Sequence, residues 1–138
     1  MKKILVVMFS VLLMFTASNT AFAGEVSNYQ LALQLIDQTN QDIDNKINKG
    51  VEKADKLQQE YLEAIKTANE SEIEELTAKY ENELTKIIEG VFYETLKMST
   101  KTIGEAYDLG VLAECSWKLV RFADREVLID PITVIGRN

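Results

Sequence analysis

The chain has 138 residues, 22 acidic and 15 basic side chains, a formal net charge of -7 and no histidine. This acidic balance argues against nucleic-acid binding, because neutralising phosphates needs a basic surface. The absence of histidine removes the commonest general base and metal ligand. Since Cys115 is the only cysteine, an intrachain disulfide is also excluded.

The first 23 residues have the three parts of a cleavable secretory signal peptide. Lys2 and Lys3 form a positive region, Ile4 to Phe15 form an apolar region, and Ala21-Phe22-Ala23 is a small-x-small cleavage site. As a helix the apolar region would span about 18 Å, short of a hydrocarbon core of about 30 Å, which disfavours an uncleaved membrane anchor. We therefore predict a secreted or extracytoplasmic protein, in the periplasm or cell envelope, that meets the membrane only before cleavage. The predicted mature part is one domain, Gly24 to Asn138. Cleavage would remove Lys2 and Lys3, so the formal net charge would change from -7 to -9.

Two long helices are predicted, over about residues 26–68 and 71–109. This stretch has no proline, few glycines and many strong helix formers. Ser71-x-x-Glu74 matches a capping box and predicts the start of the second helix. Weak helix formers between Thr39 and Gly50 leave open a break in the first helix, which would give a shorter three-helix bundle.

The apolar residues of each helix recur at steps of 3, 4 and 4 residues, an eleven-residue repeat. The two stripes mirror each other about a turn at Asn69, which favours an antiparallel helical hairpin. Eleven residues over three turns is about 3.67 residues per turn, so this coiled-coil-like pair should run nearly straight. The facing pairs predicted by this register are Ile47 with Val91, Val51 with Ile87, Ala54 with Leu84, and Leu62 with Leu76.

The periodicity changes from 3.6 to 2 after Gly110, which predicts a C-terminal β-hairpin over about residues 111–135. We expect one face of its first strand to be buried, so that Cys115 reacts slowly with thiol reagents. Pro131 predicts an edge strand or a bulge in the second strand, because proline cannot donate to the ladder. The residues of the predicted buried face are Val111, Ala113, Cys115, Trp117 and Leu119.

The predicted fold is thus mainly α with a small C-terminal β element, and its helical stripe widens at the end away from Asn69. We call this end the base. We expect the base to be the interacting end, since a wide apolar surface needs the hairpin, a partner protein or a second copy to cover it. The tip near Asn69 should be dispensable. The predicted interaction residues of the base are Leu31, Leu35, Phe92, Leu96, Ile103, Tyr107 and Trp117.

The sequence contains no GxxxxGK[ST], GxGxxG or GxSxG motif, and no pattern in it indicates catalytic, cofactor-binding or metal-binding residues. We therefore predict a non-enzymatic binding, scaffold or structural module without a cofactor. Its partner would be another protein or a second copy, with no nucleic acid and no small-molecule substrate. A small hydrolase that uses the carboxylates of Asp130 and Glu126 is an alternative, which a pair of strongly split pKa values in a cleft would favour.

The predicted layout resembles that of the jellyfish-shaped periplasmic chaperones. Those proteins join a small sheet body to helical arms, trimerise, and hold unfolded outer-membrane proteins. The resemblance lies in the arrangement of elements and not in a sequence motif, and it implies a holdase-type chaperone as an alternative function. Those chaperones are typically basic, whereas this chain is acidic.

Overall fold

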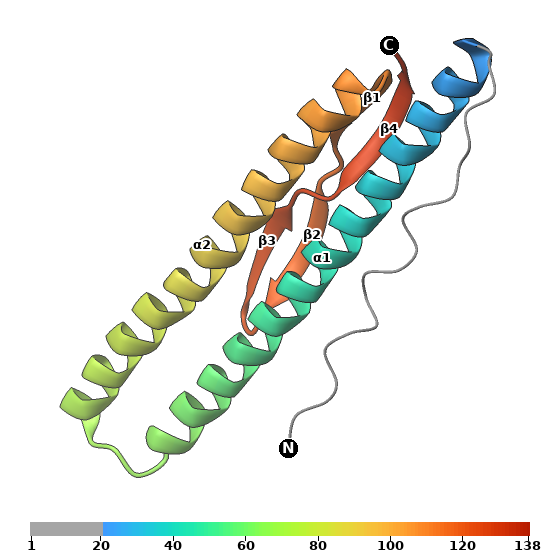
Figure 1. Cartoon of the computed structure of the whole chain (residues 1–138). Coiled ribbons are helices and arrows are strands. Elements are labelled where there is room, and N and C mark those ends of the chain that lie inside the picture. Colours follow the sequence, from blue (N-terminus) through green and yellow to red (C-terminus); the bar gives the residue numbers. More distant parts are fainter. Residues whose placement is uncertain (1–20) are drawn as a thin grey trace, which may run out of the picture.

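A computed structural model describes residues 21–138, with side chains from Ser27 onward. The positive and apolar parts of the predicted signal peptide therefore lie outside the described residues. Helices α1 (Ala21–Ala64) and α2 (Glu70–Asp108) form an antiparallel hairpin, and a β-hairpin packs along them (Figure 1). Neither helix, within the described part of the chain, has an apolar stretch long enough to cross a membrane.

Helix α1 is continuous, so the break between Thr39 and Gly50 does not occur. Its weak helix formers make contacts with the rest of the protein. The hydroxyl groups of Thr39 and Thr102 share a hydrogen bond of 2.8 Å. The side chain of Asn40 both donates to and accepts from the backbone of Ile132, at 2.8 Å in each case. These tertiary hydrogen bonds outweigh the low helix propensity of the segment.

The turn between the helices is capped by Asn69, two residues earlier than the predicted cap. Asn69 has an extended backbone, with φ -79° and ψ 173°. Its side chain accepts from the amide of Glu72 at 3.1 Å, while the Glu72 carboxylate accepts from the amide of Asn69 at 2.8 Å. This reciprocal capping box replaces the one predicted at Ser71 and Glu74, because asparagine is as good an N-cap residue as serine and comes first.

Matching stripes of the two helices are buried against each other. Ile47, Ala54, Leu84 and Val91 belong to one hydrophobic core, and Val51 and Ile87 pack against its edge. Three of the four predicted facing pairs thus lie in or beside this core. The apolar residues of the two helices, which are spaced symmetrically about Asn69, therefore form the interface of an antiparallel hairpin, as predicted.

The phase of the buried stripe differs from the prediction at two places in α2. Ile88 and Ser99 are buried, whereas their predicted counterparts Ile87 and Met98 are only half-buried. The β-hairpin covers one side of the helix pair, and residues that face it are buried in addition to those that face α1. Ser99, for example, donates through its hydroxyl to the backbone oxygen of Asp130 at 2.6 Å.

Near the tip, aromatic packing joins the helices in place of the predicted pair Leu62 and Leu76. Leu62, predicted to face Leu76, is 47% exposed. The ring of Tyr61 instead stacks on that of Tyr80, with centroids 4.6 Å apart, and its hydroxyl is 2.9 Å from that of Thr77. The tip is therefore joined by a small polar and aromatic contact, and the predicted pair Leu62 and Leu76 is not part of the core.

The C-terminal segment forms one long antiparallel hairpin in two parts. Strand β1 (Val111–Cys115) pairs with β4 (Ile132–Arg137), and β2 (Lys118–Phe122) pairs with β3 (Arg125–Ile129). The ladder breaks at Pro131, where proline offers no amide. Across the break, the amide of Ser116 donates to the Pro131 oxygen at 2.6 Å. The bulge lies elsewhere, between Leu112 and Ala113.

This hairpin runs along the helix pair from the end that contains the start of α1 and the end of α2, and its turn lies beside Tyr80 and Thr85, short of the turn at Asn69 (Figure 1). Phe122 and Ile129 contribute fully buried side chains to the larger core. Val111 and Ile132 join α1 and α2 residues in a second, smaller core. The hairpin thus supplies the layer that covers one side of the helices.

Candidate protein-interaction surface

The residues that face the helices have odd numbers in β1 and even numbers in β2, because the hairpin is interrupted between these strands. In β1 the fully buried residue is Val111, whereas in β2 the buried residues are Val120 and Phe122. Ser116 and Trp117 lie between the two strands, outside any ladder. Since strand side chains alternate with period two, this interruption moves odd-numbered positions to even-numbered ones on the inner face. The uninterrupted alternation that the sequence predicted is therefore wrong beyond Cys115.

Trp117 and Leu119 are accordingly exposed by 56% and 59%, although both were predicted to be buried. Leu119 pairs directly with Leu128 across the β2–β3 ladder, and Leu128 is 50% exposed. On the same side, Arg121 pairs with Glu126. We call the exposed large apolar residues of the hairpin the outer hairpin face. They are Trp117, Leu119, Leu128 and Ile135, whereas Val134, which is 37% exposed, lies on the same side of β4 as the buried Ile132.

Cys115 lies at the edge of the break and is half-buried, not fully buried as predicted. Its thiol points to the carboxylate of Asp130, with 3.8 Å between Sγ and Oδ2. Burial raises the pKa of the Cys115 thiol, and the neighbouring negative charge of Asp130 raises it further. The thiolate is therefore disfavoured at neutral pH, so slow reaction with thiol reagents remains the prediction for a different reason.

Asp130 is the centre of a buried polar network that fastens the hairpin to α2. Its side chain is fully buried and accepts from the Thr95 hydroxyl at 3.1 Å, while Ser99 binds its backbone oxygen. Within the described residues, every buried side-chain nitrogen or oxygen has a hydrogen-bond partner. Such a network specifies how the hairpin docks, because moving it would leave buried groups unpaired.

The two carboxylates of the hydrolase alternative have different surroundings. Asp130 is buried and hydrogen-bonded within the protein, whereas Glu126 is exposed on β3 opposite Arg121. Across the described part of the chain, no three Cys, Asp or Glu side chains are grouped so that they could hold a metal ion. The polar groups at the hairpin break therefore have a structural explanation in their mutual hydrogen bonds.

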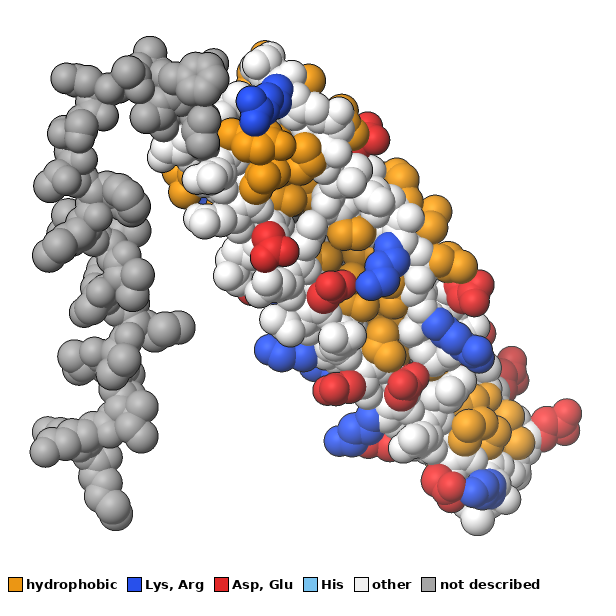
Figure 2. Space-filling model, turned by 90° about the vertical axis from the view of Figure 1, so that its right-hand side faces the viewer, with side chains coloured by type: hydrophobic (Ala, Val, Ile, Leu, Met, Phe, Trp, Pro, Cys, Tyr) orange, Lys and Arg blue, Asp and Glu red, His pale blue; other side chains and the backbone are white. Residues whose placement is uncertain are grey.

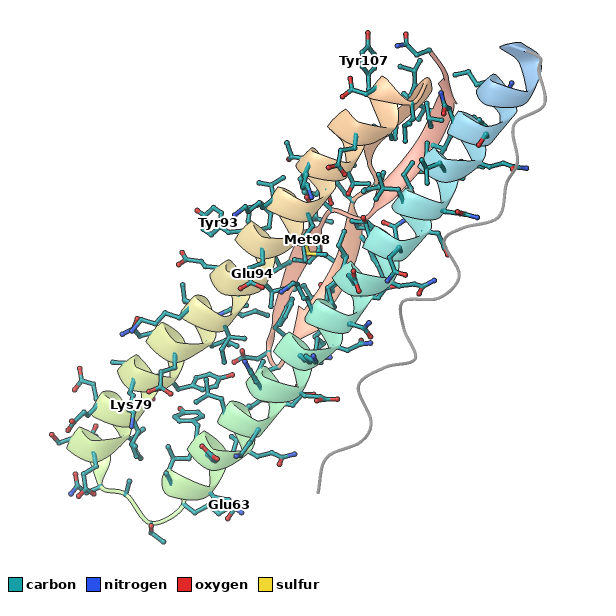
Figure 3. The ribbon with its side chains drawn as sticks, in the orientation of Figure 1. Glu63, Lys79, Tyr93, Glu94, Met98 and Tyr107 are labelled. Carbon is teal, nitrogen blue, oxygen red and sulfur yellow. The ribbon has the colours of Figure 1, made fainter. Side chains whose placement is uncertain are left out.

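The seven residues predicted for the base differ in exposure. Leu31 and Tyr107 are each 53% exposed, and Figure 3 shows Tyr107 pointing away from the helix pair near the end of α2. Trp117 lies at the break in the middle of the hairpin. The remaining four are half-buried residues of the helices, namely Leu35, Phe92, Leu96 and Ile103. The most exposed large apolar side chain is Tyr93 of α2, at 65%, and the others that are at least 50% exposed belong to the base or to the outer hairpin face.

Sequence reasoning missed Leu128, Val134 and Ile135 as exposed residues. The one signal for them is Pro131, which predicts a disturbed ladder but does not say to which side each neighbouring residue turns.

Figure 2 shows hydrophobic side chains in separate patches, with charged side chains between them. No protein-family model, curated protein or solved structure matches this chain.

Proposed function

We propose that this protein is an exported, non-enzymatic binding or scaffold module that contacts a second copy of itself, or another protein, through the outer hairpin face. The observation that supports this proposal is the exposure of this face, where each large apolar side chain is 50% to 59% exposed. Within this face, Leu119 and Leu128 lie directly opposite each other and form one exposed apolar patch, and such patches are a feature of protein-interaction sites. The signal-peptide pattern of residues 1–23 supports export.

Three features favour self-association over contact with an unrelated protein. The β2–β3 ladder has only two strands, so each strand has an unpaired edge. Leu119 and Leu128 lie opposite each other, which makes the apolar surface similar on both strands. Arg121 and Glu126 lie in register on the same side, so a two-fold axis can place the arginine of one copy against the glutamate of the other.

Light scattering during size-exclusion chromatography tests the proposal. We expect the native protein to be a dimer or a larger oligomer, and the variant Leu119→Ser/Leu128→Ser to be monomeric with unchanged circular dichroism. The matched control Leu62→Ser/Ile73→Ser removes two exposed apolar residues at the tip and should leave the oligomer intact. A native protein that is monomeric at every accessible concentration would contradict self-association.

A third variant distinguishes the outer hairpin face from the base. Leu31→Ser/Tyr107→Ser removes the two most exposed base residues that lie on the helices. We expect it to remain oligomeric. If it becomes monomeric while Leu119→Ser/Leu128→Ser does not, the interface lies at the base and not on the hairpin.

A holdase-type chaperone would use the same exposed apolar face to hold unfolded clients. Aggregation of a chemically denatured client protein, followed by light scattering, separates this alternative from self-association. A holdase would suppress aggregation, and Leu119→Ser/Leu128→Ser would abolish the suppression. A scaffold module would leave the aggregation rate unchanged.

A further inference from the structure

A hollow of about 400 Å³ lies between the two helices and is lined by four lysines. Lys46, Lys49 and Lys53 come from α1, and Lys86 comes from α2. The α1 lysines are three and four residues apart, so they share one face of the helix. That face is not the one that contacts the hairpin, where Asp44 binds Lys118.

Two glycines shape this hollow. A methyl group added at Gly50 would lie 2.5 Å from Cγ2 of Val91, so the helices approach each other closely there. A methyl group added at Gly90 would meet nothing within 4 Å, so the surface over Gly90 is open. The absence of a side chain at Gly90 therefore leaves room between the lysines for a bound group.

The hollow is positive although the chain carries a net charge of -7. Glu94 is the only acidic residue among those that line it, against four lysines. Lys46 binds the Glu94 carboxylate, and this hydrogen bond and charge, with a contribution from Lys53, hold the pKa of Glu94 below its ordinary value. Figure 3 shows Glu94 on the side of α2 that faces α1. Four lysines against one glutamate give the lining residues a net charge of +3, which concentrates positive potential in a concave surface.

We propose that this hollow binds a phosphate group that carries at least two negative charges. Lysine ammonium groups are strongly hydrated point charges with three donors each, and they bind phosphate oxygens without a fixed approach direction. Such a phosphate has two sources, a soluble polyphosphate-like anion or the headgroup of an anionic lipid. The site is separate from the outer hairpin face and does not depend on the oligomeric state.

Titration calorimetry of the full chain with sodium tripolyphosphate at low salt tests the soluble source. The variant Lys49→Gln/Lys53→Gln should weaken binding about tenfold, as expected for losing two partly exposed charge contacts. The matched control Lys56→Gln/Lys101→Gln removes two lysines that pair with glutamates outside the hollow, and it should change affinity less than twofold. Binding should weaken as salt rises, because the Debye length falls below about 10 Å above 0.1 M salt.

Gly90→Leu fills the hollow without changing the charge and should weaken binding at least as much as the lysine variant. Sedimentation with vesicles that contain phosphatidic acid, whose phosphate monoester can carry two negative charges, tests the lipid source with the same variants. Vesicle binding that shows this variant pattern, without binding of tripolyphosphate, supports a lipid headgroup. The proposal is overturned if neither probe binds at low salt, if the control variant weakens binding equally, or if Gly90→Leu, shown to be folded by circular dichroism, leaves binding unchanged.

Discussion

Gly50 and Gly90 both lie inside helices, yet replacing each by alanine should have opposite effects on stability. Alanine is favoured over glycine in a helix interior by about 1 kcal/mol. At Gly90 the added methyl group meets nothing within 4 Å, so Gly90→Ala should stabilise the protein by about this amount. At Gly50 the added methyl group would lie 2.5 Å from Val91 and 3.0 Å from Phe122.

The clash at Gly50 cannot be relieved by a simple rotation. Val91 is β-branched and has one strongly preferred rotamer in a helix. Phe122 is fully buried in the same core. Forcing a methyl group into a packed core costs about 1 to 3 kcal/mol. After the helix gain of about 1 kcal/mol is subtracted, Gly50→Ala should destabilise the protein by up to about 2 kcal/mol.

Urea denaturation followed by far-ultraviolet circular dichroism measures both variants, and a difference of 1 kcal/mol moves the midpoint by roughly 0.3 to 1 M. In a double-mutant cycle, Val91→Ala should remove most of the penalty of Gly50→Ala, because it deletes the clashing methyl group. If Gly50→Ala stabilises the protein as much as Gly90→Ala does, the close approach of the two helices at Gly50 is wrong.

Three further outcomes follow from burial and from the pKa shifts. Phe122→Ala should cost about 3 to 5 kcal/mol in urea denaturation, because the ring is fully buried, whereas Trp117→Ala should cost much less, because the indole is 56% exposed. Burial, and then a hydrogen bond to Asp124, raises the pKa of Tyr80 from 10.0 to about 12. The unfolded chain therefore loses this proton first, so stability should fall as pH rises from 10 towards 12, and Tyr80→Phe should lessen that fall. Burial also raises the pKa of Cys115, so alkylation at neutral pH should be slower in the native protein than in denaturant, and equal rates would contradict its half-buried position.

The helical hairpin follows from local features of the sequence. The eleven-residue repeat and the lack of proline specify two long helices, and the mirrored stripes specify that they pair antiparallel. The core positions Ile47, Ala54, Leu84 and Val91 were predicted from this spacing and are buried. Such features can be read along the chain because helix periodicity involves residues that are only three or four positions apart.

The position of the proposed interaction surface depends on the tertiary structure. Trp117 and Leu119 were assigned to the buried face on the assumption that the alternation is unbroken, and they are exposed because the ladder breaks between β1 and β2. Pro131 marks the break, but the side to which each following residue turns depends on how Asp130 is held by Thr95 and how the hairpin docks on α2.

The same reason applies to the lysine hollow. Lys49 and Lys53 can be placed on one helix face from their spacing, but their approach to Lys86 depends on the distance between the helices. That distance is set by Gly50, whose lack of a side chain lets α1 approach Val91. Periodicity along one chain segment predicts which face a residue occupies, whereas the contents of the space between two segments depend on packing that no local pattern records.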